Sequence, residues 1–203
     1  NALVLDNSVY RSGLVGVSLR GQVRIDPVVS QGCRGFGPTL LITKARKNII
    51  FELGGRPALH VIRELVEDLP DDEKKLLERG LFVGRVINEY KDRFGRDDFL
   101  IRNVLGVEES QNAIAVNELV RTGQTIRFHL RDAKTADEDL AMLLDAQQLR
   151  EPPVGGILIS CNGRGTRLFE SPSHDAGAIA RAFLPDRSGE ELAKGGVNIQ
   201  AEG

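Results

Sequence analysis

Short apolar runs separated by turn residues dominate two stretches of the chain. Runs of this kind are typical of strands in an antiparallel sheet. In the first stretch, the pattern predicts strands at residues 2–5, 13–19, 22–29, 39–43 and 49–53. In the second stretch it predicts strands at residues 81–87, 99–105, 113–116 and 125–130. The continuous apolar run at residues 154–161 has the pattern of a central strand covered on both faces.

Helical periodicity occurs between and after these stretches. Pro57 is tolerated at the first turn of a helix, and apolar residues then recur at helical spacing through Leu69. An acidic helix with a solvated face is predicted at residues 70–79. Thr135 and Glu138 have capping-box spacing ahead of a helix that Pro152 and Pro153 end. The helices are therefore expected near residues 58–79, 136–149 and 174–184, and the polar end at 185–203 is expected to be loop.

These elements predict an α+β protein made of two mixed units of largely antiparallel sheet flanked by helices. A length of 203 residues fits one large domain or two small ones. Because the helices at 58–79 separate the two β-rich stretches, we expect a domain boundary near residue 81. The predicted domains are residues 1–80 and 81–203.

Composition narrows the classes of function. The 27 Lys and Arg against 29 Asp and Glu give a formal net charge of −2, which argues against a basic nucleic-acid-binding domain. Aromatic residues are 5% of the chain, too few for a platform that stacks bases. With no long apolar stretch and no leader sequence, we expect a cytoplasmic protein without a membrane span. Two cysteines and three scattered histidines predict neither a disulfide scaffold nor a metal site, and no cofactor is expected.

Glycine is in excess, at 22 of 203 residues, and several of these glycines fall in two similar segments. Residues 31–37 and 160–165 each contain a cysteine, an arginine and glycines, and we expect both to be loops. Such glycines adopt positive φ angles or let the backbone approach another group closely. Backbone amides and a guanidinium together can hold a carboxylate or phosphate. This spacing favours equally a ligand-lining role and a role in tight turns with solvated arginines.

Cys33 and Cys161 are candidates for a nucleophile, since nearby arginine and loop amides favour a thiolate. The required base is not close in sequence, although folding can bring His129 or His174 near. Small, half-buried cysteines that shape a pocket are the favoured interpretation.

The segment at 125–131 places Thr125, Arg127, His129 and Arg131 on one face of a strand. A solvent-facing basic strip is favoured over an anion-binding wall. His60 lies away from the apolar stripe of its helix and is expected to be exposed. His174 and Asp175 fall at a helix start, where capping and the helix dipole account for them.

Four motifs occur in an order that resembles the FIST family, named for F-box and intracellular signal transduction proteins. They are Val29-Ser30-Gln31-Gly32-Cys33-Arg34 with Gly37, Phe99-Leu100-Ile101-Arg102-Asn103-Val104-Leu105-Gly106, Phe128-His129-Leu130-Arg131-Asp132-Ala133 and Ser160-Cys161-Asn162-Gly163-Arg164-Gly165. The part up to about residue 67 resembles the end of the FIST N-terminal domain, and residues 81–184 resemble most of the FIST C-terminal domain. The first part of the former and the closing segment of the latter are not found in this sequence.

The resemblance implies a sensory, signal-transduction module that binds small ligands such as amino acids. It also implies signalling or ubiquitin-ligase protein partners. With the two glycine segments, it leads to the hypothesis of a non-enzymatic module whose pocket binds a small anionic ligand. The expected ligand-binding residues are Cys33, Arg34, Gly35, Arg102, Asn103, Cys161, Asn162, Gly163, Arg164 and Gly165. The alternatives are a protein-interaction scaffold, an F-box-associated recognition module and, with less weight, a cysteine-dependent enzyme.

Overall fold

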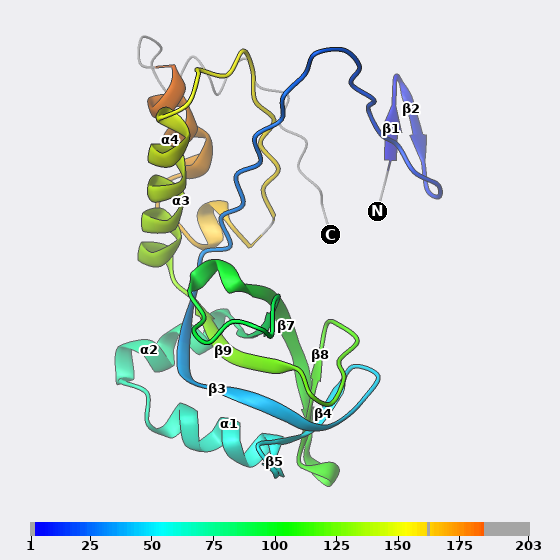
Figure 1. The fold of residues 1–203 in the computed structure, drawn as a ribbon, viewed down its shortest axis with the longest axis vertical. Helices are drawn as coiled ribbons and strands as arrows, with labels where there is room; N and C mark the ends of the chain where they lie inside the picture. The colour runs from blue at the N-terminus through cyan, green and yellow to red at the C-terminus, as the bar shows by residue number, and fades with distance from the viewer. Residues whose placement is uncertain (1–2, 162, 185–203) are drawn as a thin grey trace. The chain divides into compact units, whose positions relative to one another are not determined.

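The computed structural model describes residues 3–161 and 163–184 (Figure 1). The chain divides into two compact units. Residues 31–139 form the sheet unit, and residues 3–30 with the described residues from 140 onward form the terminal unit. Helix α3, Ala133–Gln148, begins in the sheet unit and ends in the terminal unit.

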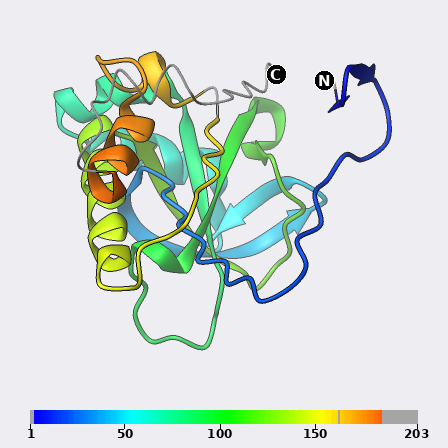
Figure 2. The ribbon, with the colours of Figure 1, turned by 90° about the horizontal axis from the view of Figure 1, so that it is seen from above.

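The sheet unit is built on antiparallel strands that close into a ring. Their order is β3-β9-β6-β7-β8-β4, and β4 pairs back with β3, while the short β5 extends from β4. Figures 1 and 2 show these strands from two directions. Their bounds are β3 Cys33–Arg46, β4 Ile49–Leu53, β5 Arg56–Pro57, β6 Leu81–Val86, β7 Phe99–Glu108, β8 Ala113–Val116 and β9 Thr125–Arg131.

Two long strands make the closure possible, because each pairs with different neighbours along its length. Strand β3 pairs with β9 through Leu41 and with β4 from Ile42 onward. Strand β7 pairs with β6 up to Asn103 and with β8 from Val104 onward. Irregular register lies near both changes of partner, as expected where a strand must bend.

The core of the sheet unit consists of apolar side chains from the strands and from one helix. Strand side chains such as Ile42, Ile126 and Phe128 are fully buried. Helix α1, Ala58–Glu67, adds Val61 and Ile62 to the same cluster and contacts β4 and β8. Helix α2, Asp71–Leu76, buries none of its residues and is followed by the 3-10 turn η1, Leu77–Arg79, which confirms the predicted solvated acidic helix.

The expectation of a loop at residues 31–37 is wrong, because β3 begins at Cys33. The expected glycine geometry is nevertheless present. Gly32 and Gly37 have φ angles of +62° and +61°, and a Cβ on Gly35 would lie 3.0 Å from Nε of Arg127. Arg127 lies across Gly35 and donates a hydrogen bond of 2.9 Å to the Gly37 carbonyl oxygen. Pairing with β9 therefore makes a strand from residues whose local preference is for turns.

The terminal unit contains a two-stranded antiparallel sheet, β1 (Leu3–Leu5) with β2 (Ser8–Tyr10), and helix α4 (His174–Phe183). The predicted strands at residues 13–19, 22–29 and 154–161 are wrong, since these described segments are irregular. An apolar run becomes a strand only when a neighbouring strand satisfies its backbone groups. The predicted loop at 185–203 lies outside the described residues.

Most other predicted elements are confirmed to within a few residues, and the predicted α+β class is confirmed. The described residues contain two antiparallel sheets and the helices α1 to α4. The ring in the sheet unit takes strands from both sides of residue 80. Division of the chain into domains at residues 1–80 and 81–203 stays a prediction. No described helix has the length and apolar character needed to cross a membrane.

Candidate functional site

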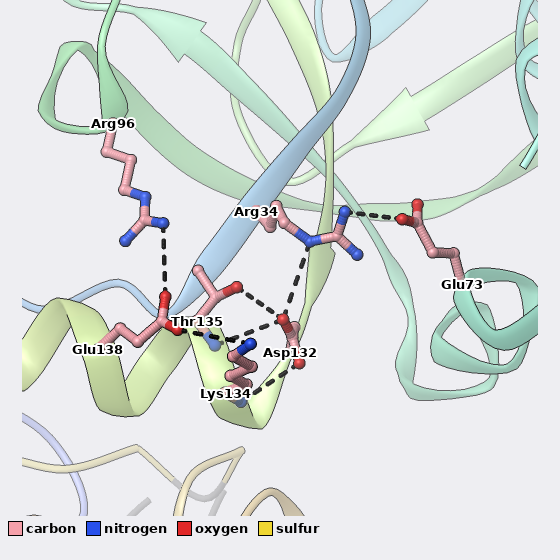
Figure 3. A network of polar contacts seen from close by, with 7 residues as sticks. All are labelled: Arg34, Glu73, Arg96, Asp132, Lys134, Thr135 and Glu138. Atoms are coloured by element: carbon pink, nitrogen blue, oxygen red, sulfur yellow. Dashed lines mark hydrogen bonds and ion pairs between the residues drawn. The ribbon is translucent and has the colours of Figure 1, made fainter. Parts of the chain in front are cut away.

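Arg34 is held by two carboxylates within the sheet unit (Figure 3). Its Nη1 donates a hydrogen bond of 2.9 Å to Oε1 of Glu73 on α2, and its Nε lies 3.8 Å from Oδ2 of Asp132. Asp132 precedes α3 and accepts a hydrogen bond of 2.6 Å from the hydroxyl of Thr135. Arg34 therefore connects β3 to α2 and to the start of α3. Its side chain is 35% exposed, so it is not sealed from solvent.

Asp132 is the charged centre of this network. Burial raises the pKa of its carboxyl, but hydrogen bonds from Thr135 and Lys134 and the charge of Arg34 outweigh burial, and the pKa lies below its ordinary value. The carboxylate also accepts backbone N–H groups of the first turn of α3, so it acts as an N-terminal cap. On the same helix Glu138 lies 3.9 Å from Nη2 of Arg96 (Figure 3).

Strand geometry separates the predicted site residues of the sheet unit into two groups. Gly35, His129, Phe82 and Asn103 are cross-strand partners in one row across β3, β9, β6 and β7. Because side chains alternate between faces, Cys33 shares the face of Gly35, and Arg34 belongs to the opposite face. By the same rule Arg102 lies opposite to Asn103. The five predicted site residues of the sheet unit therefore do not line one surface.

The basic strip on β9 is not solvent-facing at its centre, which corrects the favoured interpretation. His129 is 4% exposed, its ring centroid is 5.2 Å from that of Phe99, and its Nδ1 donates to the carbonyl oxygen of Arg127 at 2.9 Å. Burial lowers the pKa of His129 to about 4, so the imidazole is neutral at pH 7. The guanidinium carbon of Arg131 lies 4.7 Å from the centroid of the Phe82 ring.

Arg102 has a different environment from Arg34. Its Nη1 donates to the carbonyl oxygen of Ile101 at 2.9 Å, and its Nε lies 3.8 Å from Oε2 of Glu118. Glu118 is already taken by Arg85, which donates to both carboxylate oxygens at 3.0 and 2.9 Å. Hydrogen bonds from Arg85 lower the pKa of Glu118 against the effect of burial. Two guanidinium groups thus share one carboxylate, and the Arg102 side chain remains 36% exposed.

Sequence reasoning missed Arg85, Glu118 and Gln31 as members of these arrangements. Gln31 was present in the first motif, and its side-chain amide pairs with the edge of β7. It donates to the carbonyl oxygen of Phe99 at 2.8 Å and accepts from the Ile101 N–H at 3.1 Å. No sequence signal identifies this contact, since the partners are about 70 residues away and are backbone groups.

The second glycine segment belongs to the terminal unit. Cys161 is exposed, Asn162 lies outside the described residues, and Gly163 is half-buried. Gly165 has a φ of +68° and begins the short 3-10 turn η4, Gly165–Arg167. Arg164, between these glycines, is the centre of a polar cluster with α4.

Arg164 forms a two-pronged contact with Asp175 in the first turn of α4. The Nε–Oδ2 and Nη2–Oδ1 distances are 2.5 and 2.8 Å, and both side chains are 10% exposed. The Phe169 ring lies 5.4 Å from the guanidinium carbon and stacks on His174 with centroids 3.6 Å apart. Burial raises the pKa of Asp175, but Arg164 and His174 outweigh it and the pKa is lowered. The fork of Arg164 therefore already holds a carboxylate of the protein itself.

His60 is exposed, as predicted. Among the described residues no group of three or more His, Cys, Asp or Glu side chains is placed to hold a metal ion.

Cys33 is buried and lies opposite Arg131 in the register of β3 and β9, while His129 lies opposite Gly35.

Comparisons with known proteins identify the family. The FIST N domain model matches residues 1–56, and the FIST C domain model matches residues 58–188. An uncharacterized protein of Mycobacterium tuberculosis is 46% identical over 179 residues, which are 87% of this chain and 46% of that protein. An uncharacterized protein of Mycobacterium bovis is 44% identical over the same length and with the same coverage. The chain thus spans about half the length of the curated relatives it matches.

No solved structure matches the chain. FIST domains are sensory domains of signal transduction. The two domain models together cover most of the sequence, and the matched order is the N domain followed by the C domain. The chain belongs to the FIST family.

Proposed function

We propose that this chain is a cytoplasmic, non-enzymatic sensory module that binds a small anionic metabolite, with amino acids as the first class to test. Its output passes to a signalling or ubiquitin-ligase protein partner. Family membership supports the sensory role. The anionic character of the ligand rests on the arginines of the family-like motifs, because a guanidinium matches a carboxylate in geometry and charge.

The sharing of Glu118 between Arg85 and Arg102 is the observation that carries the proposal. Arg85 takes both oxygens of Glu118, whereas Arg102 reaches one of them at 3.8 Å. Arg102 therefore keeps donors and positive charge for an added carboxylate. Arg164 has less capacity, since Asp175 already fills its fork. Arg34 lies between Glu73 and Asp132.

Ligand binding at Arg102 would change the contact of Arg102 with Glu118, in which the two side chains are 36% and 20% exposed. The side chains of Arg85 and Glu118 are each 20% exposed. A ligand carboxylate competes with Glu118 for Arg102 and leaves the contact between Arg85 and Glu118 intact. Because Arg85 is on β6 and Arg102 on β7, occupancy acts on two neighbouring strands of the ring.

Isothermal titration of the full chain against amino acids and small carboxylates tests this proposal. We expect saturable binding that Arg102→Ala weakens about tenfold or more, as for loss of a charge-assisted hydrogen bond. Glu118→Gln removes the competing charge and is expected to tighten binding. Arg63→Ala is the matched control, because the pair that Arg63 forms with Glu109 is exposed.

Two outcomes contradict the proposal. One is the absence of saturable binding for every anion in the panel. The other is binding that Arg102→Ala and Glu118→Gln leave unchanged while both variants remain folded. Circular dichroism of each variant distinguishes loss of the site from loss of the fold.

A protein-interaction role is the second candidate, and exposed apolar residues of the terminal unit favour it. Leu14 and Val17 in one segment and Ile157 and Ile159 in another are exposed. Large exposed apolar side chains such as these provide surface that a partner protein can cover. Replacement of Ile157 and Ile159 by Ser should abolish binding of a purified stoichiometric partner and leave amino-acid titrations unchanged.

A further inference from the structure

The hairpin of β3 and β4 carries a basic depression that is separate from the Arg102 site. Lys44, Ala45, Arg46 and Phe51 line it together with Gln111 of the 3-10 turn η3 (Glu109–Gln111). Its volume of about 540 Å³ lies within the range of pockets that hold small ligands, and it opens broadly to solvent. All lining residues belong to the sheet unit.

Irregular pairing between β3 and β4 places Phe51 on the same surface as Lys44 and Arg46. Register shifts flank Lys44, which pairs with Glu52, while the next pair is Ala45 with Ile50. Phe51 is therefore the unpaired residue of β4. Ile50 is fully buried, so alternation directs Phe51 to the other face, where it is half-buried. An aromatic ring is thus presented beside two cationic side chains.

The charges in the depression are incompletely balanced. Lys44 has Glu52 as a carboxylate neighbour, at an Nζ–Oε1 distance of 3.7 Å between exposed groups, which is a weak interaction. Among the described residues Arg46 contacts a ring rather than a carboxylate, and its guanidinium carbon lies 6.0 Å from the centroid of Phe51. A ligand anion therefore finds guanidinium and ammonium donors without displacing a tight internal pair.

We propose that this depression binds a small anion that carries a planar ring. The anionic group contacts Arg46 and Lys44, because both donate charge-assisted hydrogen bonds to carboxylate or phosphate. The ring packs against Phe51, which prefers offset or edge-to-face neighbours. Gln111 supplies amide donor and acceptor atoms at the rim for ring substituents. Both an aromatic carboxylate and a nucleoside monophosphate meet this description.

Two pairs of probes separate the contributions of charge and ring. Benzoate and acetate share a carboxylate, and only benzoate carries a ring. Adenosine monophosphate and inorganic phosphate share a phosphate, and only the nucleotide carries a ring. Amide chemical shifts of the full chain report each titration at Lys44 to Arg46 and at Phe51. We expect the ring-bearing member of at least one pair to bind about tenfold more tightly than its partner. That pair identifies the anionic group.

Variants assign the binding to these side chains. Arg46→Gln should weaken the preferred probe about tenfold. Phe51→Leu keeps an apolar side chain, and should weaken the ring-bearing probe about threefold to tenfold while leaving the ringless probe unchanged. Arg63→Gln, on α1, is the control for loss of one surface charge and should have no effect.

Equal binding of ring-bearing and ringless probes in both pairs overturns the proposal. So does a failure to saturate, or binding that Arg46→Gln leaves intact. The result is independent of the proposed function, because Arg102→Ala should not change binding at the hairpin. Loss of both responses in Arg102→Ala, with the fold retained, would also count against two separate sites.

Discussion

The imidazole of His129 lies directly over the backbone of Gly84. A Cβ at position 84 would come within 2.4 Å of Cε1 of His129 and 3.0 Å of the Phe99 Cβ. Gly84→Ala is therefore expected to destabilise the fold by about 1–3 kcal/mol, as overpacking does. Chemical denaturation measures the change.

Gly106 on β7 provides the matched control. Nothing lies within 4 Å of a Cβ built there, so Gly106→Ala should be neutral or stabilising by up to about 1 kcal/mol. Addition of His129→Ala should reduce the cost of Gly84→Ala, because the ring is then gone. Equal stability of Gly84→Ala and Gly106→Ala would contradict the close approach of the His129 ring to Gly84.

Burial of neutral His129 makes stability depend on pH. Its pKa is lowered from 6.5 to about 4, so the unfolded state binds more protons between these values. The contribution of neutral, buried His129 to the free energy of unfolding is complete above about pH 6.5 and is lost as pH falls toward 4. The shift corresponds to about 3 kcal/mol at most. Denaturation of His129→Leu at several pH values should show a flatter profile in this window, and the exposed-site control His60→Gln should keep the original slope.

The pairing of Gln31 with the edge of β7 predicts a local effect. Gln31→Ala removes two hydrogen bonds and should cost about 1–2 kcal/mol. Faster hydrogen exchange at the Ile101 amide is the specific readout. Exposed Gln22 offers a control substitution to Ala with no expected effect. An unchanged Ile101 exchange rate in Gln31→Ala would rule out the contact.

The contact between Arg164 and Asp175 should stabilise the start of α4. Asp175→Asn removes the charge from a contact whose side chains are 10% exposed, so a loss of about 2 kcal/mol is expected. Hydrogen exchange of the α4 amides detects it. Asp26→Asn is the control, because Asp26 pairs with the exposed side chains of Arg24 and Arg150 and such pairs contribute little. Similar effects of both substitutions would contradict a special role for Asp175.

The two cysteines should differ in reactivity. Cys161 is exposed and Cys33 is buried, so iodoacetamide is expected to modify Cys161 in the folded protein and both residues in denaturant. Mass spectrometry of digested protein reads the two sites separately. A thiol enzyme requires in addition a product or a covalent intermediate at one of them, which the non-enzymatic proposal excludes.

Local pattern was sufficient for many elements of this fold. Strand β8 has the predicted bounds, and β4 also matches. Helices α1, α3 and α4 lie within a few residues of their predicted positions. Amphipathic periodicity and breakers such as Pro57 carry this information within a short window.

The candidate site was less accessible to sequence reasoning. The motif residues were identified, but partners such as Glu73 for Arg34 and Glu118 for Arg102 were not. Neither an ion pair nor its competition with a ligand is visible in spacing. Whether the ten predicted residues bind a ligand stays a prediction.

By itself, the sequence determined the α+β class, the position of most helices and strands, and the resemblance to the FIST family, because these depend on periodicity and motif order. Only the tertiary structure decided that β3 pairs with both β9 and β4 to close the sheet, and that residues 33–37 form a strand. It also decided that His129 is buried and that Asp175 binds the guanidinium of Arg164. Strand pairing and ion pairing join residues far apart in the chain, and their energies depend on burial and on the partner rather than on local sequence.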